Sequence, residues 1–289
     1  MDTFSWSSSA LPDLTGRTAV VTGATRGIGR AVREALEKAG ATVLGGARTV
    51  DGAGVEVLDL ADLGTVRAFA RSVRERVGQV DLLVNNAAIS NVPFSLTPGG
   101  TESQFAVNHL GHFALTHLLR PLMREGARVV TVTSAMYPML DTLDLAALAD
   151  EGSYSPGVAY VRSKAANVLF ATELERRLRT SGSGVRSLLA EPGLAATSMH
   201  DGYPDEGTTQ AVRAALAETG RPASSASAGV LYAATAGEVD GFVVYGPVGD
   251  RETPDVVATP IAGLGLDQEL AAALWEQSAR LTEVVPVSI

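Results

Sequence analysis

The sequence predicts one α/β domain, a doubly wound parallel sheet of about seven strands with helices on both faces. Short apolar runs rich in β-branched residues alternate with amphipathic stretches of helical length almost to the end of the chain. This pattern is typical of strands buried between two layers of helices. A glycine-rich turn joins the first apolar run to the first helical stretch, and no repeat or linker divides the 289 residues. We therefore expect a single domain.

The expected strands are short apolar runs, each followed by a turn or a helical pattern. They cover residues 18–21, 42–46, 55–58, 81–84, 128–133, 185–190 and 241–245. Helices are expected where apolar residues recur at intervals of three and four, which is at 28–39, 62–77, 101–124, 158–179 and 267–283. Residues 136–157 lack this periodicity. Folds of this kind bind ligands beyond the carboxyl ends of their strands.

Composition and charge exclude several classes of function. A net charge of −9 argues against a general affinity for nucleic acid or anionic membranes. The chain has no cysteine, which excludes disulfides and thiolate catalysis, and no apolar run of membrane-spanning length. Residues 1–15 lack the cationic start and apolar core of a signal peptide, so we expect a flexible extension before a domain over residues 16–289. These features favour a soluble, cytoplasmic protein.

The glycine-rich turn predicts a phosphate-binding site. It reads Thr22-Gly23-Ala24-Thr25-Arg26-Gly27-Ile28-Gly29 and lies between the first strand and the first helix. Such a turn aims unpaired backbone N–H groups and the positive end of the helix dipole at an anion. Glycines let the backbone approach a pyrophosphate closely, because no Cβ stands in the way. Taken alone, the turn is also compatible with a simple connection between two elements.

Tyr160 and Lys164 form a second candidate motif. They stand four residues apart on an expected helix, so their side chains share one face. We expect the ammonium to favour the phenolate and bring the tyrosine pKa from about 10 closer to neutrality. Lys38 and Lys164 are the only lysines in a chain that otherwise uses arginine, a bias that fits a GC-rich bacterial genome. Without other motifs, a surface Tyr–Lys pair is an equally good interpretation.

Two further polar residues occur at informative places. Ser134 follows a strand, where its hydroxyl is suited to binding a substrate oxygen or to closing a turn. Asn108 is an amide inside an otherwise apolar helix, where polar groups need partners.

Together these motifs resemble the short-chain dehydrogenase/reductase family, which has a Rossmann-type fold. The motifs occur in this chain in the same order as in the family: TGxxxGxG, Asn85-Asn86-Ala87-Ala88, Asn108, Ser134, Tyr160-x-x-x-Lys164 and Pro192-Gly193 with Thr197. The resemblance covers roughly residues 16–236. The run NHLGHF, the 26-residue interval from Ser134 to Tyr160, and SYSPGVAYVRSKAANVLFATELERRL resemble the retinol-dehydrogenase-like branch.

The resemblance implies a role for each matching residue. Tyr160 would donate the proton, Lys164 would support it and bind the ribose, Ser134 would hold the carbonyl oxygen, and Asn108 would anchor a water. Asn85 and Ala87 would line the cofactor site with Pro192 and Gly193, and Thr197 would cap the nicotinamide amide or the diphosphate. Asp59 resembles the aspartate that contacts adenine, with Leu60 beside it. Ala88 departs from the usual glycine.

The residues after the second strand favour NADP over NAD. NAD-selective proteins place an acid there for the ribose 2′-hydroxyl, but this chain has Ala47 followed by Arg48. Arg26 adds another cation in the glycine-rich turn. Two guanidinium groups and no carboxylate suit a 2′-phosphate. Either arginine alone is also compatible with a solvated surface position.

The substrate side is defined by few residues. Met136 and Tyr154 lie in the irregular segment, and Met199 lies in a polar stretch at about 194–222 that resembles the family's mobile substrate loop. Methionine and tyrosine favour a mostly apolar substrate. Alternatively, residues 194–222 form an ordinary surface loop.

The three histidines His109, His112 and His117 have no cysteine or paired carboxylate nearby. We therefore expect them to pack between helices and to line the pocket, and we expect no metal.

We therefore expect an NADP(H)-dependent oxidoreductase, a ketone or aldehyde reductase that acts on a small, mostly apolar carbonyl or alcohol. A homodimer or homotetramer is compatible with the apolar terminal helix. A non-catalytic NADP(H)-binding scaffold or sensor and a non-redox lyase or isomerase on the same fold are the alternatives. The set Asn108, Ser134, Tyr160 and Lys164 argues against the scaffold, since a protein without turnover does not need all four.

Overall fold

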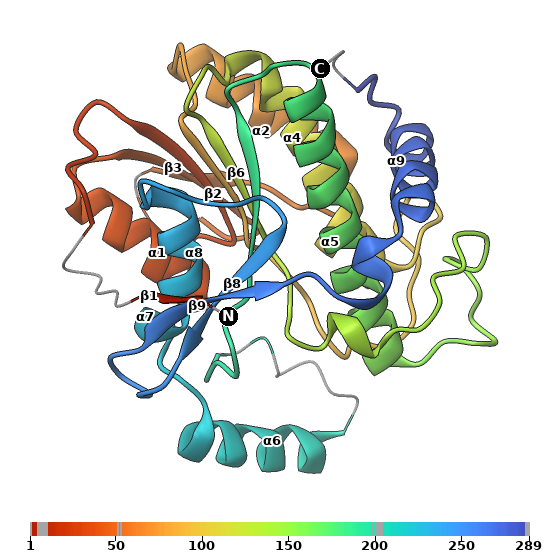
Figure 1. Ribbon diagram of the computed structural model, residues 1–289. Helices are drawn as coiled ribbons and strands as arrows, with labels where there is room; N and C mark the ends of the chain where they lie inside the picture. The colour runs from red at the N-terminus through yellow and green to blue at the C-terminus, as the bar shows by residue number, and fades with distance from the viewer. Residues whose placement is uncertain are drawn as a thin grey trace.

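A computed structural model of the chain describes residues 2–4, 11–50, 52, 54–197, 199 and 205–286. In these residues nine strands form one sheet in the order β1-β9-β8-β7-β6-β5-β2-β3-β4 (Figure 1). The strands are β1 (Asp2–Phe4), β2 (Thr18–Thr22), β3 (Thr42–Ala47), β4 (Val55–Val57), β5 (Leu82–Asn85), β6 (Arg128–Val132), β7 (Arg186–Ala190), β8 (Val243–Val248) and β9 (Asp255–Pro260).

The strands from β4 to β8 are parallel, and only the β8–β9 and β9–β1 pairs are antiparallel. The chain crosses from one half of the sheet to the other beside β2, which pairs with β3 on one side and β5 on the other. In a doubly wound sheet such a crossing opens a crevice at the carboxyl ends of the strands. The ends of β2, β5 and β6 therefore mark the place for a ligand.

Helices cover both faces of the sheet, as expected (Figure 1). They are α1 (Gly27–Lys38), α2 (Leu63–Arg76), α3 (Ser103–Phe105), α4 (Gly111–Leu119), α5 (Pro156–Thr180), α6 (Glu206–Thr219), α7 (Ala223–Ala226), α8 (Ala228–Thr235) and α9 (Gln268–Thr282). Apolar residues of α1 and α8 form one core against the sheet. Those of α2, α4 and α5 form the second core on the other face.

The expected helix over 101–124 is divided into several pieces. Residues Ala106–Leu110 form one turn of π-helix between α3 and α4, and Arg120–Leu122 form a 3₁₀ turn after α4. Gly111 begins α4 where a Cβ would lie 2.5 Å from the carbonyl oxygen of Leu60. The backbone therefore packs directly on the segment that follows β4. A π-turn within a helix is often found at functional sites, and this one contains Asn108.

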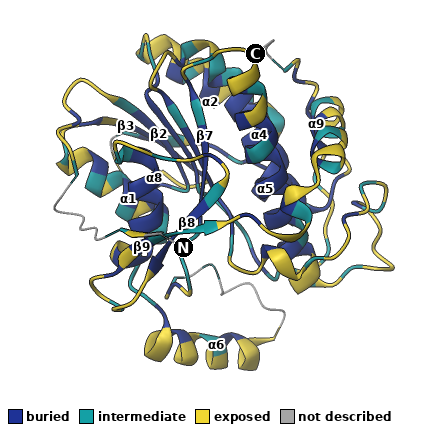
Figure 2. Ribbon diagram, in the orientation of Figure 1, coloured by how far each residue is buried: buried dark blue, intermediate teal, exposed yellow. Residues whose placement is uncertain are grey.

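The terminal helix, for which packing on the sheet or on a partner subunit was expected, packs mainly on α5 and α4. The ring of Trp275 in α9 lies 5.3 Å from Phe113 of α4 and 6.0 Å from Phe170 of α5, measured between ring centres. Aromatic pairs at such distances stabilise packing beyond the area they bury. α9 is thus an outer layer over α4 and α5 (Figure 2).

Two expectations about the sheet require correction. The sheet has nine strands where we expected seven, because β9 adds to β8 and β1 adds to β9. Residues 1–15 were expected to be a flexible extension, but Asp2–Phe4 pair with Val256–Ala258 as an edge strand. The phenyl ring of Phe4 lies 5.0 Å from the ring of Tyr232 in α8. Met1 and residues 5–10 lie outside the described residues.

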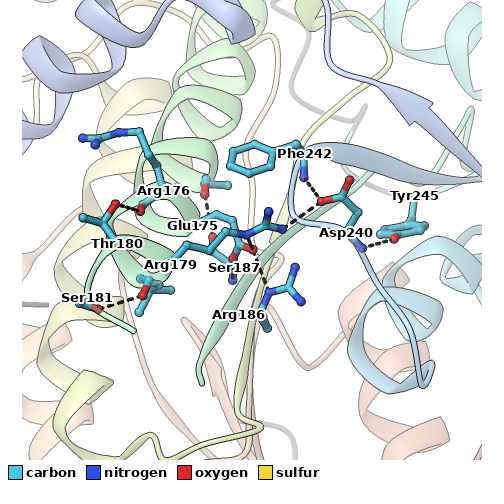
Figure 3. A network of polar contacts seen from close by, with 12 residues as sticks. Glu175, Arg176, Arg179, Thr180, Ser181, Arg186, Ser187, Asp240, Phe242 and Tyr245 are labelled. Atoms are coloured by element: carbon cyan, nitrogen blue, oxygen red, sulfur yellow. Dashed lines mark hydrogen bonds and ion pairs between the residues drawn. The ribbon is translucent and has the colours of Figure 1, made fainter. Parts of the chain in front are cut away.

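A buried carboxylate, that of Glu175, ties α5 to the start of β7 (Figure 3). The side chain of Glu175 has no exposed surface and accepts hydrogen bonds from Arg179 Nε at 2.8 Å and Arg186 Nε at 2.8 Å. The backbone N–H of Ser187 donates to the other carboxylate oxygen at 2.7 Å. The network fixes the start of β7 against α5 and has a structural role.

Candidate active site

The glycine-rich turn approaches the neighbouring strand too closely for side chains. A Cβ on Gly29 would lie 2.2 Å from the carbonyl oxygen of Gly23 and 2.5 Å from Asn86 Nδ2. Gly23 and Gly27 have φ angles of +68° and +54°, which favour glycine. The turn is therefore a tight cradle above β2, and the N-terminus of α1 lies directly after it. This geometry fits a dinucleotide phosphate.

A cavity of about 400 Å³ lies at the carboxyl ends of β2, β3, β5 and β6. Most of the residues expected to bind the cofactor line it: Gly23, Thr25, Arg26, Gly27, Ile28, Gly29, Arg48, Asp59, Leu60, Ala87, Tyr160, Lys164, Pro192 and Thr197. Met199, expected on the substrate side, also lines it. The turn, the Tyr160–Lys164 helix and the segment after β7 thus meet in one cavity, although they lie far apart in the chain.

Tyr160 and Lys164 lie on the face of α5 that borders this cavity. The Nζ atom of Lys164 lies 5.8 Å from the centre of the Tyr160 ring and donates to the carbonyl oxygen of Val132 at 3.0 Å. Both side chains are buried, with 8% of Tyr160 and 2% of Lys164 exposed. The sheet therefore holds the ammonium close to the phenol.

The pKa values of this pair differ from the sequence-based expectation. Burial lowers the pKa of Lys164 to about 8 and raises the pKa of Tyr160 to about 12. A hydrogen bond with Ser134 lowers the tyrosine pKa and the Glu191 carboxylate raises it, but burial has the largest effect. We expected the ammonium to bring this pKa down; in the protein alone the pKa is raised, because burial desolvates the phenolate. Tyr160 is consequently a protonated phenol at neutral pH.

Both polar atoms of the Asn108 side chain form hydrogen bonds to other residues of the protein. Its Oδ1 accepts from the backbone N–H of Ile89 at 2.9 Å, and its Nδ2 donates to the Ile89 carbonyl at 2.9 Å and to Ser163 Oγ at 2.8 Å. Ser163 in turn donates to the Tyr160 carbonyl oxygen at 2.7 Å. The side-chain amide thus joins α5 to the cavity wall at Ile89, and both of its polar ends have protein partners.

Two cationic side chains border the cavity where β3 ends. Arg26 and Arg48 line it there together with Thr49 and Ala47. Arg26 and Arg48 are exposed. The Asp59 carboxylate accepts from the backbone N–H of Ala61 at 3.0 Å, which holds it at the wall.

Three expected cofactor residues do not line the cavity. Thr22 is fully buried beneath the turn, where its Oγ1 accepts from the backbone N–H groups of Asn86 at 2.9 Å and Ala87 at 3.0 Å. Asn85 points away and donates to Thr116 Oγ1 at 3.0 Å; its neighbour Asn86 forms the wall instead. Gly193 lies just behind Pro192, and its N–H donates to Glu191 Oε2 at 2.7 Å.

The expected substrate residues are only partly brought together. Ser134 adjoins Tyr160, but Met136 is 44% exposed and outside the cavity lining. Tyr154 has a structural role, because its hydroxyl donates to the Val92 carbonyl at 2.7 Å and accepts from Gln104 Nε2 at 2.8 Å. In the stretch at 194–222, α6 lies apart from the domain body with most residues exposed (Figure 2). Ser198 and residues 200–204 lie outside the described residues.

Several lining residues were missed by the sequence analysis. They are Thr49, Leu58, Asn86, Ile89, Val107, Val132 and Thr133. All but Val107 lie at the carboxyl end of a strand or within four residues after it, so position at a strand end was the usable signal. Among the described residues, no three His, Asp or Glu side chains are grouped as metal ligands. No helix in the described part of the chain is long and apolar enough to span a membrane.

Comparison with known proteins identifies relatives of the whole domain. The family model described as short chain dehydrogenase matches residues 17–207. A mouse (Mus musculus) polyprenol dehydrogenase is 37% identical, over 94% of this chain and 85% of its own. Human retinol dehydrogenase 14 is 34% identical, over 91% of this chain and 85% of its own. A crystal structure of an uncharacterised Mycobacterium paratuberculosis protein has 35% identity and a TM-score of 0.77, covering 98% and 99% of the two chains.

Two solved structures at 25% identity carry a nicotinamide cofactor. A Burkholderia phymatum short-chain dehydrogenase/reductase holds NAD, with a TM-score of 0.58 over 74% of this chain and 84% of its own. A Burkholderia cenocepacia short-chain dehydrogenase holds NADP, with a TM-score of 0.61 over 79% of this chain and 95% of its own. The fold thus accepts either dinucleotide.

Proposed function

The chain belongs to the short-chain dehydrogenase family, in its retinol-dehydrogenase-like branch, and on this premise we propose that it is an NADP(H)-dependent reductase. Its substrate would be a small, mostly apolar ketone or aldehyde or, for the reverse reaction, the corresponding alcohol. The observation that carries the proposal is the single cavity lined by the glycine-rich turn, by Arg26 and Arg48, and by Tyr160 with Lys164.

The residues at the cavity fit the two ends of such a dinucleotide. The turn at Gly23–Gly29 is tightly packed, since a Cβ on Gly29 would collide with the Gly23 carbonyl oxygen, and its backbone N–H groups at the start of α1 would bind a pyrophosphate. Arg26 and Arg48 would bind the 2′-phosphate, and Thr49 offers a hydroxyl beside them. Lys164 would bind the nicotinamide ribose. The bound cofactor supplies the hydride.

Tyr160 and Ser134 would stabilise the negative charge that develops on the carbonyl oxygen of the substrate. The Ser134 hydroxyl would donate a hydrogen bond to that oxygen, and the Tyr160 hydroxyl would give up its proton. The raised phenol pKa suits this direction, because Tyr160 stays protonated until the alkoxide forms. The Lys164 ammonium would then stabilise the phenolate.

The substrate class rests on the lining of the cavity and on the names of relatives. Ile89, Val107, Val132 and Met199 give the walls apolar surface, and two relatives are named for the long apolar alcohols polyprenol and retinol. We include retinaldehyde and a short polyprenal among the candidate substrates for that reason.

The test is a screen for NADPH and NADH oxidation with apolar aldehydes, ketones and quinones. We expect turnover with NADPH on at least one apolar carbonyl and at least tenfold higher kcat/KM with NADPH than with NADH. Turnover that persists in Tyr160→Phe contradicts the role of Tyr160 as proton donor. Absence of turnover throughout despite NADPH binding contradicts a reductase and favours the scaffold alternative.

A further inference from the structure

His112 lies between the glycine-rich turn and the Asn108 turn. The imidazole is 1% exposed, and its Nε2 lies 2.8 Å from Thr22 Oγ1 at the end of β2. Its Nδ1 lies 3.0 Å from the carbonyl oxygen of Asn108, four residues earlier in the chain. One side chain thus connects an element of the expected cofactor site with an element of the expected proton-transfer site.

The hydrogen-bond directions in this network are determined by chemistry. Burial lowers the His112 pKa to about 4, so the ring is neutral near pH 7 and carries one N–H. The Asn108 carbonyl can only accept, which places the proton on Nδ1 and makes Nε2 an acceptor. Thr22 then donates its hydroxyl proton to Nε2 at 2.8 Å, which is nearer than its other acceptor, the Val84 carbonyl oxygen at 3.3 Å. The Thr22 oxygen remains free to accept from the Asn86 and Ala87 backbone N–H groups.

Both ends of this chain of hydrogen bonds reach the cavity. At one end Thr22 holds Asn86 and Ala87, which form the wall facing the glycine-rich turn. At the other end Asn108 holds Ile89 and, through Ser163, the helical turn that carries Tyr160. The Lys164 ammonium also acts electrostatically on His112. A hydrogen-bonded network of this kind orients its members as a unit.

We propose that His112 is a positioning residue with two separate contacts, one that supports dinucleotide binding at the turn and one that supports proton transfer at Tyr160. By accepting from Thr22 it holds the wall against which the cofactor binds. By donating to the backbone carbonyl of Asn108 it fixes the residue whose side-chain amide binds Ser163 next to Tyr160. The inference rests on the proposed function, and it assigns a role to a histidine that sequence analysis attributed to packing.

Two amide substitutions separate the two halves of the role. In His112→Asn the side-chain nitrogen takes the place of Nδ1, so the bond to Asn108 is kept and the acceptor for Thr22 is lost. In His112→Gln the amide takes the place of Nε2, so the Thr22 contact is kept and the Asn108 bond is lost. His112→Phe loses both. His109→Leu is the matched control, because His109 is buried in the same segment but bonds Ser278 of α9 at 2.8 Å.

We expect His112→Asn to raise the Kd for NADPH roughly tenfold with little change in kcat. His112→Gln should lower kcat roughly 10- to 100-fold, the usual effect of misplacing a reacting group, and should enlarge the solvent deuterium isotope effect while the Kd stays near the wild-type value. His109→Leu should lower only the melting temperature.

Equal effects of the two amide variants on Kd and kcat, or effects on melting temperature alone, would refute this dual role of His112. Fluorescence titration of NADPH needs no turnover, so the Kd comparison still tests His112 if no carbonyl is reduced. A wild-type protein that binds NADPH but reduces nothing would count against the proposed function, and a similar Kd in both amide variants would count against the dual role.

Discussion

The Lys164 ammonium is bound by the Val132 carbonyl oxygen at 3.0 Å, while its Nζ stays 5.8 Å from the centre of the Tyr160 ring. Val132 ends β6, two residues before Ser134, so the strand that presents the serine also holds the lysine. One proton of the ammonium is used by the sheet, and the others are directed to the cavity that Lys164 lines. The charge is therefore fixed in place before any ligand binds.

Replacing Tyr160 by Phe should lower kcat by roughly 10²–10⁴-fold, the usual contribution of a general acid. The ring and its packing remain, so the melting temperature and the Kd for NADPH should stay near wild-type values. Steady-state kinetics with the best carbonyl and a fluorescence titration provide the two numbers. Wild-type turnover in this variant would show that Tyr160 is not the proton donor.

Replacing Lys164 by Arg should weaken both turnover and NADPH binding. The charge is kept, but a planar guanidinium does not fit the space between the Val132 carbonyl and the Tyr160 ring, where the side chain is 2% exposed. The same two measurements apply, and Lys38→Arg, at the end of α1, is the control. If Lys164→Arg kept the wild-type kcat and the wild-type Kd for NADPH, a compact ammonium would not be required for turnover or for cofactor binding.

Replacing Ala47 by Asp should shift cofactor preference from NADPH toward NADH. The new carboxylate would lie at the wall beside Arg48 and repel a 2′-phosphate. Loss of the charged hydrogen bonds costs about 1.5–3 kcal/mol, which is about one to two decades in Kd. Titration of both cofactors with both proteins measures the shift, and Ala47→Asn controls for size. Equal Kd values of the wild type for NADPH and NADH would contradict the cofactor assignment.

Acid should destabilise the fold through buried histidines. Burial lowers the pKa of His117 from 6.5 to about 4, and neither ring nitrogen has a hydrogen-bond partner in the described structure. Between these values the unfolded chain takes up a proton that the folded chain does not, so stability present above pH 6.5 is lost as the pH falls toward 4. The loss is roughly 3 kcal/mol for this one residue.

The His117→Leu variant isolates this effect. The residue is packed between Phe113 and Trp275, with ring centres 4.5 Å and 4.8 Å away, so a leucine keeps the apolar contact. Urea unfolding at pH 7 and pH 5 should show a smaller difference in the variant than in the wild type. An unchanged difference would mean that His117 does not contribute to the pH dependence.

Replacing Glu175 by Gln should lower the free energy of unfolding by roughly 2–4 kcal/mol, because Arg179 and Arg186 lose a buried anionic partner. The amide keeps the shape but carries no charge. Glu276→Gln is the control: its side chain is 62% exposed and 3.8 Å from Arg177, so its loss should be near zero. Urea denaturation of the wild type and the two variants measures the free energy of unfolding. Equal values would show that the network makes no net contribution to stability.

The parallel strands could be predicted because each is an apolar run between turns, whereas β1 and β9 could not. Asp2–Phe4 has three residues and no alternation, and Asp255–Pro260 contains a threonine next to its terminal proline. Both become strands because a neighbouring edge offers free backbone groups. That is a tertiary cause, which local pattern does not encode.

The candidate site was predicted well where motifs lie on regular elements and poorly where a strand ends. Which of Asn85 and Asn86 faces the cavity depends on where the side chains of β5 stop alternating between the two faces of the sheet. The backbone N–H groups of Asn86 and Ala87 donate to Thr22 Oγ1, and these hydrogen bonds determine that point. Tyr154 lies in a segment without periodicity, so only the structure reveals that Val92 and Gln104 occupy its hydroxyl.

The pairing of β1 with β9 covers part of one edge of the sheet. β9 has six residues, and β1 covers three of them, at Val256–Ala258. Without β1 these backbone groups would form an open, twisted edge to which a strand of a second molecule could add. Shortening the chain at its N-terminus would therefore create an aggregation-prone surface on the opposite side of the sheet from β4, without touching any residue of the cavity.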